Sequence, residues 1–328
     1  MENAPAPLFD VDEYRPAASR AGGDAQGAPG TGLVEVVRWF HHQSSSYEEK
    51  FGAALRQSID EVLDGQRTGR FDIEELEKTE KTYLGTKAEI VVRSEFDLDR
   101  GTAMDYSIAG CEVDAKFTIG NNWTIPTEAM GHICLLMSAN DSKSSFRVGL
   151  LKITEDVLNK GQNKDQKRTL SAGGRAAIHW LVPDGHLPEN ILLSLSEEER
   201  HLIFNAAGPY RATPRGGQKR INKLLQTVQG RVIDRTTAIT VATQLDGPKR
   251  VRDARKALQP EGILVLGHQD RDPKIASALG LPVPTKGSWL SVRVYRVPSG
   301  SDRPAAEING ELYAVALPDE PAAPAPSY

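Results

Sequence analysis

Two acidic residues and one lysine lie on a short segment with the pattern of a β-hairpin. Asp105 precedes a turn at Ala109–Gly110, and Asp114 and Lys116 follow the turn in the run Cys-Glu-Val-Asp-Ala-Lys-Phe. An acid, one spacer and a lysine occur five times in the chain, so the triplet alone carries little information. Its place on an expected strand, beside another acid, selects the copy that starts at Asp114.

The expected hairpin brings these side chains together. Alternation along the strand puts Asp114 and Lys116 on one face, away from the apolar residues between and beside them. A two-residue turn pairs position 108 with 111 and sets Asp105 directly opposite Asp114, with Cβ atoms about 5 Å apart. Such carboxylates repel unless a cation lies between them, and Mg²⁺ prefers oxygen ligands of this kind. Lys116 can orient a water or stabilise a phosphate, and Glu89 can supply a third carboxylate. A surface hairpin with scattered charges is the alternative interpretation.

The elements around the hairpin predict an α/β domain with a mixed sheet. Helical spacing indicates helices over 46–63 and 126–137, and Asp72 can cap a charged helix over 73–81. The segment 84–96 suits a helix or a strand, whereas 103–108, 111–119 and 146–153 have strand patterns. We expect a disordered arm at 1–30, a first domain at 31–181, a linker at 182–190, a second domain at 191–315 and a disordered tail at 316–328.

The second domain has the outline of a mostly helical winged helix-turn-helix. A capping box runs from Ser196 to Glu199, and helices are expected near 217–229, 236–244 and 248–258. Strands at 262–266 and 288–297 could form the wing.

A basic surface in this domain is a candidate DNA-binding region. Residues 205–260 hold 12 Lys and Arg against 3 Asp and Glu, although the whole chain has a net charge of −4. A solvated basic face is the alternative. The candidate phosphate or base contacts on the expected helices are Lys219, Arg220, Lys223, Lys249, Arg250, Arg252, Arg255 and Lys256. Asn121 and Asn122, which follow the catalytic strand, could reach bases, or could belong to a turn beside a packed Trp123.

Several other classes are disfavoured. No apolar run is long enough to span a membrane, no secretory signal is evident, and two cysteines suggest a reducing cytoplasm. The run from Val62 to Arg67 is similar to the lysine-containing nucleotidyl-transfer motif of DNA ligases. Val62 stands where that motif has its lysine nucleophile, which argues against covalent nick sealing or a topoisomerase-like activity, and a helix end near Gly65 is favoured.

The sequence resembles the NaeI-like type IIE restriction endonucleases of the PD-(D/E)xK nuclease superfamily. The resemblance runs through 78–90, the hairpin and the following domain, and covers nearly the whole chain apart from its termini. It implies a PD-(D/E)xK core with the catalytic set Glu89, Asp105, Asp114 and Lys116, and Mg²⁺ held by the three carboxylates. Met104, in place of the proline of the family pattern, precedes Asp105, and that proline is often missing in the family.

The resemblance also implies a partner set. The C-terminal domain would be similar to the catabolite-activator helix-turn-helix and would bind a second, activating copy of double-stranded DNA. The protein would act as a homodimer on a palindromic GC-rich site, such as GCCGGC, with no membrane association. Two alternatives stay open: a non-catalytic winged-helix regulator, and a repair or mismatch nuclease on the same core.

Overall fold

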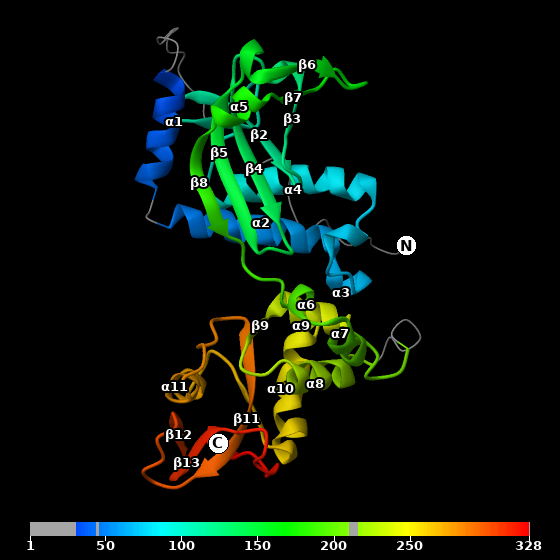
Figure 1. Cartoon of the computed structure of the whole chain (residues 1–328), viewed down its shortest axis with the longest axis vertical. Helices are drawn as coiled ribbons and strands as arrows, with labels where there is room; N and C mark the ends of the chain where they lie inside the picture. Colours follow the sequence, from blue (N-terminus) through cyan, green and yellow to red (C-terminus); the bar gives the residue numbers. More distant parts are fainter. Residues whose placement is uncertain (1–30, 44–45, 210–215, 328) are drawn as a thin grey trace, which may run out of the picture.

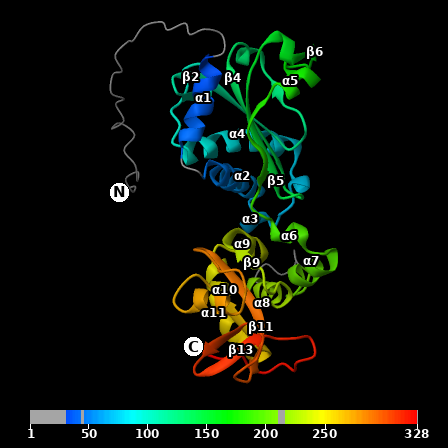
Figure 2. The ribbon, with the colours of Figure 1, turned by 60° about the vertical axis from the view of Figure 1, so that its left-hand side comes forward.

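The computed structural model describes residues 31–43, 46–209 and 216–327, which form two successive parts along the long axis of the molecule (Figures 1 and 2). The first part is a mixed sheet covered by long helices, and the second combines a group of helices with a further sheet. The disordered arm expected at 1–30 lies outside the described residues.

The helices of the first part are α1 (Thr31–His42), α2 (Tyr47–Leu63), α3 (Gly65–Thr68), α4 (Lys78–Glu95) and α5 (Ala172–Ala176), with 3-10 turns η1 (Ile73–Glu75), η2 (Thr127–Ala129) and η3 (Glu155–Val157). Its strands are β1 (Tyr106–Ile108), β2 (Cys111–Thr118), β3 (Thr124–Ile125), β4 (Ile133–Asn140), β5 (Ser145–Lys152), β6 (Leu158–Gln162), β7 (Arg168–Leu170) and β8 (His179–His186). The main sheet has the order β1-β2-β4-β5-β8, and β3, β7 and β6 form a small second sheet. Only β2 and β4 run parallel, so the main sheet is mixed, as expected.

Strand β4 is buried on both faces. Its residues Leu135 and Met137 belong to the core under α1, α2 and α4, whereas Cys134 and Leu136 belong to a second core under the small sheet. The helix expected over 126–137 is therefore wrong. A strand covered on both sides reads as one continuous apolar run, and such a run has no period that separates it from a buried helix.

Helix boundaries also differ from expectation. Helix α2 begins after Ser46 as expected, but its end is formed by Asp64 in the left-handed conformation, with φ 48°, and Gly65 already starts α3. Asp72 caps only the 3-10 turn η1, and the ambiguous segment 84–96 belongs to the long helix α4. The strand expected at 103–108 is shorter, because residues before Tyr106 form a loop.

The second part contains α6 (Ile191–Ser194), α7 (Glu197–Phe204), α8 (Gly217–Thr227), α9 (Arg235–Ala242), α10 (Gly247–Leu258), η5 (Gln259–Glu261) and α11 (Asp272–Ala278). Its strands are β9 (Val232–Asp234), β10 (Ile263–Leu266), β11 (Ser288–Val297), β12 (Ala305–Ile308) and β13 (Glu311–Val315). The sheet order is β10-β11-β13-β12, with β9 also paired to β11. The capping box at Ser196, the three expected helices and both expected strands are present. No helix among the described ranges is long and apolar enough to cross a membrane.

The two segments expected to be irregular are partly built into the fold. Strand β8 continues to His186, so most of the linker expected at 182–190 is sheet. The tail expected to be disordered from 316 lies against the second part through residue 327. Ala325 is buried and its N–H donates to the Gln259 carbonyl at 2.8 Å, and Arg303 pairs with Glu320 at 2.6 Å. Its proline- and alanine-rich composition resembles that of disordered chains, but two polar anchors hold it.

Candidate active site

The hairpin that carries two of the acids has the predicted register. Ala109 and Gly110 both have positive φ, 51° and 76°, which is the backbone of a two-residue hairpin turn with right-handed twist. Ile108 therefore pairs with Cys111 and Tyr106 with Val113. Asp105 comes directly before this ladder, outside its paired residues, and its carboxylate reaches β2 beside Asp114, at the Ala115 N–H.

Asp105 and Asp114 are held by neighbouring backbone and side chains. Asp105 Oδ2 accepts a hydrogen bond from the Ala115 N–H at 2.7 Å. Asp114 is only 6% exposed, and its two oxygens accept from Lys116 Nζ at 2.8 Å and from Cys134 Sγ at 3.5 Å. Lys116 Nζ thus lies beside the aspartate pair, as strand alternation predicted.

Glu89 reaches the same place from α4. The Tyr106 hydroxyl donates to the Glu89 carbonyl at 2.9 Å, which ties this turn of α4 to the start of β1. Burial raises the pKa of the Glu89 carboxyl, and the nearby charge of Asp105 raises it further. Arg93 is 3.9 Å away and opposes that shift only in part. The structure therefore brings the four predicted residues together: Glu89, Asp105, Asp114 and Lys116.

The electrostatics of this cluster favour a bound cation. Burial raises the pKa of Asp114 to about 6, against the attraction of Lys116, and Asp105 adds to the rise. Partly buried carboxylates that lie close together repel one another unless a positive charge lies between them. Within the described residues, no group of three His, Cys, Asp or Glu side chains is arranged so that it could hold a metal ion. Mg²⁺ keeps several waters and needs few carboxylates, so Asp105 and Asp114, assisted by Glu89, are a donor set that fits it.

The residues of α10 that were predicted to contact DNA differ in their exposure to solvent. Val251, Ala254 and Leu258 are buried and attach the helix to the second core, as its spacing predicted. Lys249, Arg252, Arg255 and Lys256 are exposed, while Arg250 is half-buried and pairs with Asp246 at 3.1 Å. Arg255 also forms an ion pair, with the buried Asp272, so Lys249, Arg252 and Lys256 are the cations of this helix most open to a ligand.

Arg220 was predicted to contact phosphate, and that prediction is wrong. Its exposure is 0%, and its guanidinium donates to the carbonyls of Val241 and Ala242 and to the Thr243 hydroxyl. The side chain satisfies the carbonyl end of α9, a role that leaves no trace in a count of basic residues. Lys219, its neighbour, is exposed.

The two asparagines after β2 also differ. Asn122 accepts from the Trp123 N–H at 2.9 Å and donates to the Leu170 carbonyl at 3.1 Å, while Trp123 is buried. The packed-turn alternative therefore describes Asn122, whereas Asn121 is exposed. Sequence reasoning also missed Glu112, whose side chain turns toward the loop before Asp105. Its place two residues before Asp114 on an alternating strand was the available signal.

Comparison with known proteins assigns the chain to a family. The family model described as "Restriction endonuclease NaeI" matches residues 35–324. A relative named "Type II restriction enzyme NaeI", from Lentzea aerocolonigenes, is 44% identical over 301 residues, covering 89% of this chain and 93% of the relative. The chain therefore belongs to the NaeI family of restriction endonucleases and is a type II site-specific deoxyribonuclease.

Proposed function

We propose that this chain hydrolyses double-stranded DNA with Mg²⁺ held by Asp105 and Asp114 and assisted by Glu89. The convergence of these three carboxylates with Lys116, from one helix and one hairpin, is the observation that carries the proposal. We further propose that the sheet β1-β2-β4-β5-β8 with its flanking helices is a PD-(D/E)xK core.

The roles of the residues follow from their positions. Bound Mg²⁺ would polarise the scissile phosphate and neutralise charge that develops on its oxygens. Lys116, whose ammonium lies 2.8 Å from Asp114, orients the attacking water and stabilises the phosphate as it becomes five-coordinate. Asp105 is kept in place by the Ala115 N–H and faces Asp114 across the hairpin. In-line attack by water would leave a 5′-phosphate and a 3′-hydroxyl.

The second part is proposed to be a winged helix-turn-helix that binds a further DNA duplex. Helices α9 and α10 pack against α8 and are joined by a short turn, and β10 and β11 stand where a wing would be. The exposed cations Lys249, Arg252 and Lys256 give α10 a positive face for phosphates or guanine edges.

The contact between the two parts supports a coupling between them. This contact, the seam, is formed by residues 64–71 of the first part and by α9, Phe204 and Asn190 of the second. Helix α3 lies so close to α9 that a Cβ on Gly65 would come within 2.2 Å of the Thr240 hydroxyl oxygen. Phe71 stacks on Phe204 at 5.6 Å, and Asn190 donates to the Phe71 carbonyl at 2.7 Å. The segment 64–71 is therefore packed firmly against the helices of the second part.

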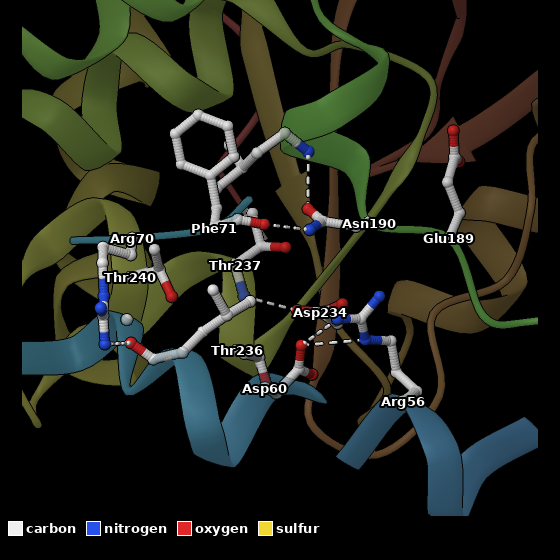
Figure 3. Close-up of a pocket in the computed structure, with 13 residues that line it drawn as sticks. Arg56, Asp60, Arg70, Phe71, Glu189, Asn190, Asp234, Thr236, Thr237 and Thr240 are labelled. Atoms are coloured by element: carbon white, nitrogen blue, oxygen red, sulfur yellow. Dashed lines mark hydrogen bonds and ion pairs between the residues drawn. The ribbon is translucent and has the colours of Figure 1, made fainter. Parts of the chain in front are cut away.

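The same segment reaches the helix that carries Glu89. Arg70 donates through both terminal nitrogens to the two carboxylate oxygens of Glu80, at 2.9 and 2.8 Å, in the first turn of α4. Arg70 also lines a pocket between the two parts, together with Asp60 and Asp234 (Figure 3). A shift of α9 on binding DNA would therefore be passed to α4. We propose that a second DNA copy activates cleavage by this route.

Arg70→Met tests the coupling. It should reduce stimulation by added effector duplex while basal cleavage persists, because the lost bonds, to Glu80 and to the Leu63 carbonyl, do not involve the hairpin cluster. Arg67→Met is the matched control, since Arg67 is exposed and its one ion pair among the described residues is with Asp64, nearby in sequence. Equal stimulation of wild type and Arg70→Met would contradict the route.

The target is proposed to be a palindromic GC-rich site, GCCGGC, cut by a homodimer. A palindrome has two-fold symmetry, which two copies of one chain match. The support is the similarity to the NaeI relative across both parts of the chain.

Plasmid cleavage tests the whole proposal. Wild type and Asp114→Ala are incubated with plasmid DNA in Mg²⁺ or EDTA, with and without a GCCGGC duplex, and the ends are mapped. Discrete Mg²⁺-dependent bands ending at GCCGGC, lost in the variant, are expected. Tight DNA binding without cleavage would favour the regulator alternative, and cuts at damaged or mismatched sites would favour the repair nuclease.

A further inference from the structure

A single carboxylate gathers three consecutive backbone N–H groups just before Asp105. Glu112 Oε1 accepts from Thr102 at 2.8 Å, and Oε2 accepts from Ala103 at 2.9 Å and Met104 at 2.8 Å. These are charge-assisted hydrogen bonds, which are stronger than bonds between neutral groups. Residues 102–104 are not helical, so the carboxylate caps no helix and instead shapes a loop.

The loop is packed tightly against the hairpin. A Cβ on Gly101 would lie 2.5 Å from Glu112 Oε2 and 2.4 Å from the Met104 carbonyl oxygen, so only glycine fits there. On the other side, Ser107 donates to the Asp99 carbonyl at 2.9 Å. The chain thus folds back on itself between 99 and 107, with the Glu112 carboxylate inside the bend.

The bend ends at a catalytic residue. Asp105 follows Met104 directly and lies outside the regular pairing of β1, which begins at Tyr106. Its own carboxylate has one backbone partner, the Ala115 N–H. The position of the Asp105 backbone is therefore set from one side by β1 and from the other by the N–H groups that Glu112 holds.

The Glu112 carboxylate is engaged by the loop before Asp105, through the N–H groups of Thr102, Ala103 and Met104. It accepts no hydrogen bond from Lys116, whose ammonium is engaged by Asp114 and the Ala115 carbonyl.

We propose that Glu112 is a positioning residue that fixes the separation between Asp105 and Asp114 for a divalent cation. The inference rests on the proposed Mg²⁺ site and deepens it. Removing the carboxylate would leave three N–H groups without their acceptor and let Asp105 move away from Asp114. Residues that orient metal ligands through hydrogen bonds change metal affinity or activity by about 10–100-fold when they are replaced.

Two variants and one control test the role. Glu112→Ala removes the acceptor, and Glu112→Gln keeps the shape and one acceptor oxygen. Glu199→Gln is the matched control, because Glu199 also accepts a backbone N–H, that of Ser196 at 2.8 Å, but in the second part of the chain. Single-turnover cleavage is measured against Mg²⁺ concentration, with DNA affinity measured without metal and unfolding measured in parallel.

The expected result is a rise of about tenfold or more in the Mg²⁺ concentration for half-maximal cleavage with Glu112→Ala, and a smaller rise with Glu112→Gln. DNA affinity should stay within about threefold, since Glu112 is proposed to touch no DNA. Glu199→Gln should behave as wild type. An unchanged Mg²⁺ requirement in folded Glu112→Ala would overturn the proposal.

Two readouts separate this proposal from the nuclease proposal. Backbone hydrogen exchange at 102–104 should accelerate in both Glu112 variants without any metal, and unchanged exchange would overturn the loop role. Binding of Mn²⁺ alone, followed by electron paramagnetic resonance, should weaken in Glu112→Ala. Mn²⁺ binding that weakens in the variant, while wild type cleaves no DNA, would support the positioning role and refute the nuclease. Equal Mn²⁺ binding by wild type and Glu112→Ala, or none by either, would overturn it.

Discussion

Asp114 in the hairpin and Asp60 on α2 have similarly raised pKa values but lie in different surroundings. Burial raises the pKa of each to about 6, and neighbouring carboxylates add to the rise in both. Asp60 lies at the seam between the two parts of the chain, beside Arg56 and Asp234 (Figure 3). Asp114 lies beside Lys116 and opposite Asp105.

The two clusters differ in how fully their acceptors are used. At the seam, Arg56 donates to both Asp60 and Asp141, Asn190 lies 3.5 Å from Asp141, and Asp234 caps α9 through the Thr237 N–H at 2.6 Å. The bonds of Arg56 tie α2 to the β4–β5 turn, and the bond of Asp234 holds the start of α9. The seam carboxylates are thus engaged by groups of the chain itself.

In the hairpin cluster, acceptors are left over. Within the described residues, the Glu89 carboxylate receives no hydrogen bond, and its ion pair with Arg93 is long at 3.9 Å. The Asp60 cluster is therefore engaged by donors of the chain itself, whereas the Asp114 cluster contains an unused carboxylate at Glu89. A raised pKa among satisfied partners marks architecture, whereas one among unused acceptors indicates a place for a ligand.

The largest effect that sharpens this comparison is expected from Lys116→Ala. Loss of the ammonium should lower single-turnover cleavage by about 100–1000-fold, as for other groups that stabilise developing charge. DNA affinity without metal should change little. Rapid gel quantification of cleavage and a binding titration measure both quantities, and cleavage at the wild-type rate would remove Lys116 from the mechanism.

Arg56→Met should lower the free energy of unfolding and should not act on the cleavage chemistry. Asp141 is 3% exposed, so removing its guanidinium partner leaves a buried carboxylate without an ion pair, at a cost of about 3–5 kcal/mol. Denaturant unfolding of the first part gives the value. A loss below about 1 kcal/mol would show that the seam is not held by this ion pair.

Two arginines of the second part should likewise differ, one affecting stability and the other DNA binding. Arg220→Ala removes a fully buried group that serves three acceptors and should cost about 2–4 kcal/mol. Arg252→Ala should leave stability within about 0.5 kcal/mol but lower the salt dependence of DNA binding by about one ion. Thermal unfolding and binding titrations at several salt concentrations check the pair, and the reverse pattern would contradict the assignment.

The smallest effect is a gain in stability from Asp114→Asn in metal-free protein. The folded pKa of Asp114, about 6, exceeds its ordinary 3.8, so the folded form binds the proton more tightly. Stability is therefore lost as the pH rises from about 4 through 6, and the loss is complete above that range. Asparagine avoids it and should add about 1 kcal/mol at pH 8, after the lost bond to Lys116 is discounted. The gain should vanish at pH 4. A variant that is less stable than wild type at pH 8 would contradict the account.

Local rules were enough to predict the hairpin and much of the second part. The turn at Ala109–Gly110 sets the register up to the pair of Tyr106 with Val113, and Asp105 and Asp114 are the next residue on each strand. The capping box at Ser196 marks a helix start, because its partners are neighbours in the sequence. Such features depend only on short-range geometry.

The errors arose where distant partners decide the structure. Strand β4 was read as a helix because its second buried face comes from β3 and β7, which cannot be seen in a local pattern. Arg220 was read as a DNA contact because its acceptors lie on α9, about twenty residues away in sequence. Strand alternation put Glu112 on the face of Asp114, but its role was missed because its three partners are backbone N–H groups of a loop, which the pattern does not reveal.

The comparison of the two aspartates is tested most directly by one titration. Single-turnover cleavage of a GCCGGC duplex is measured against Mg²⁺ concentration for wild type, Asp114→Asn and Asp60→Asn. We expect wild type and Asp60→Asn to require similar Mg²⁺ concentrations, and Asp114→Asn to remain inactive at every concentration. Cleavage by Asp114→Asn with the wild-type Mg²⁺ requirement, or a lost requirement in Asp60→Asn, would contradict the assignment of the hairpin as the metal-dependent site.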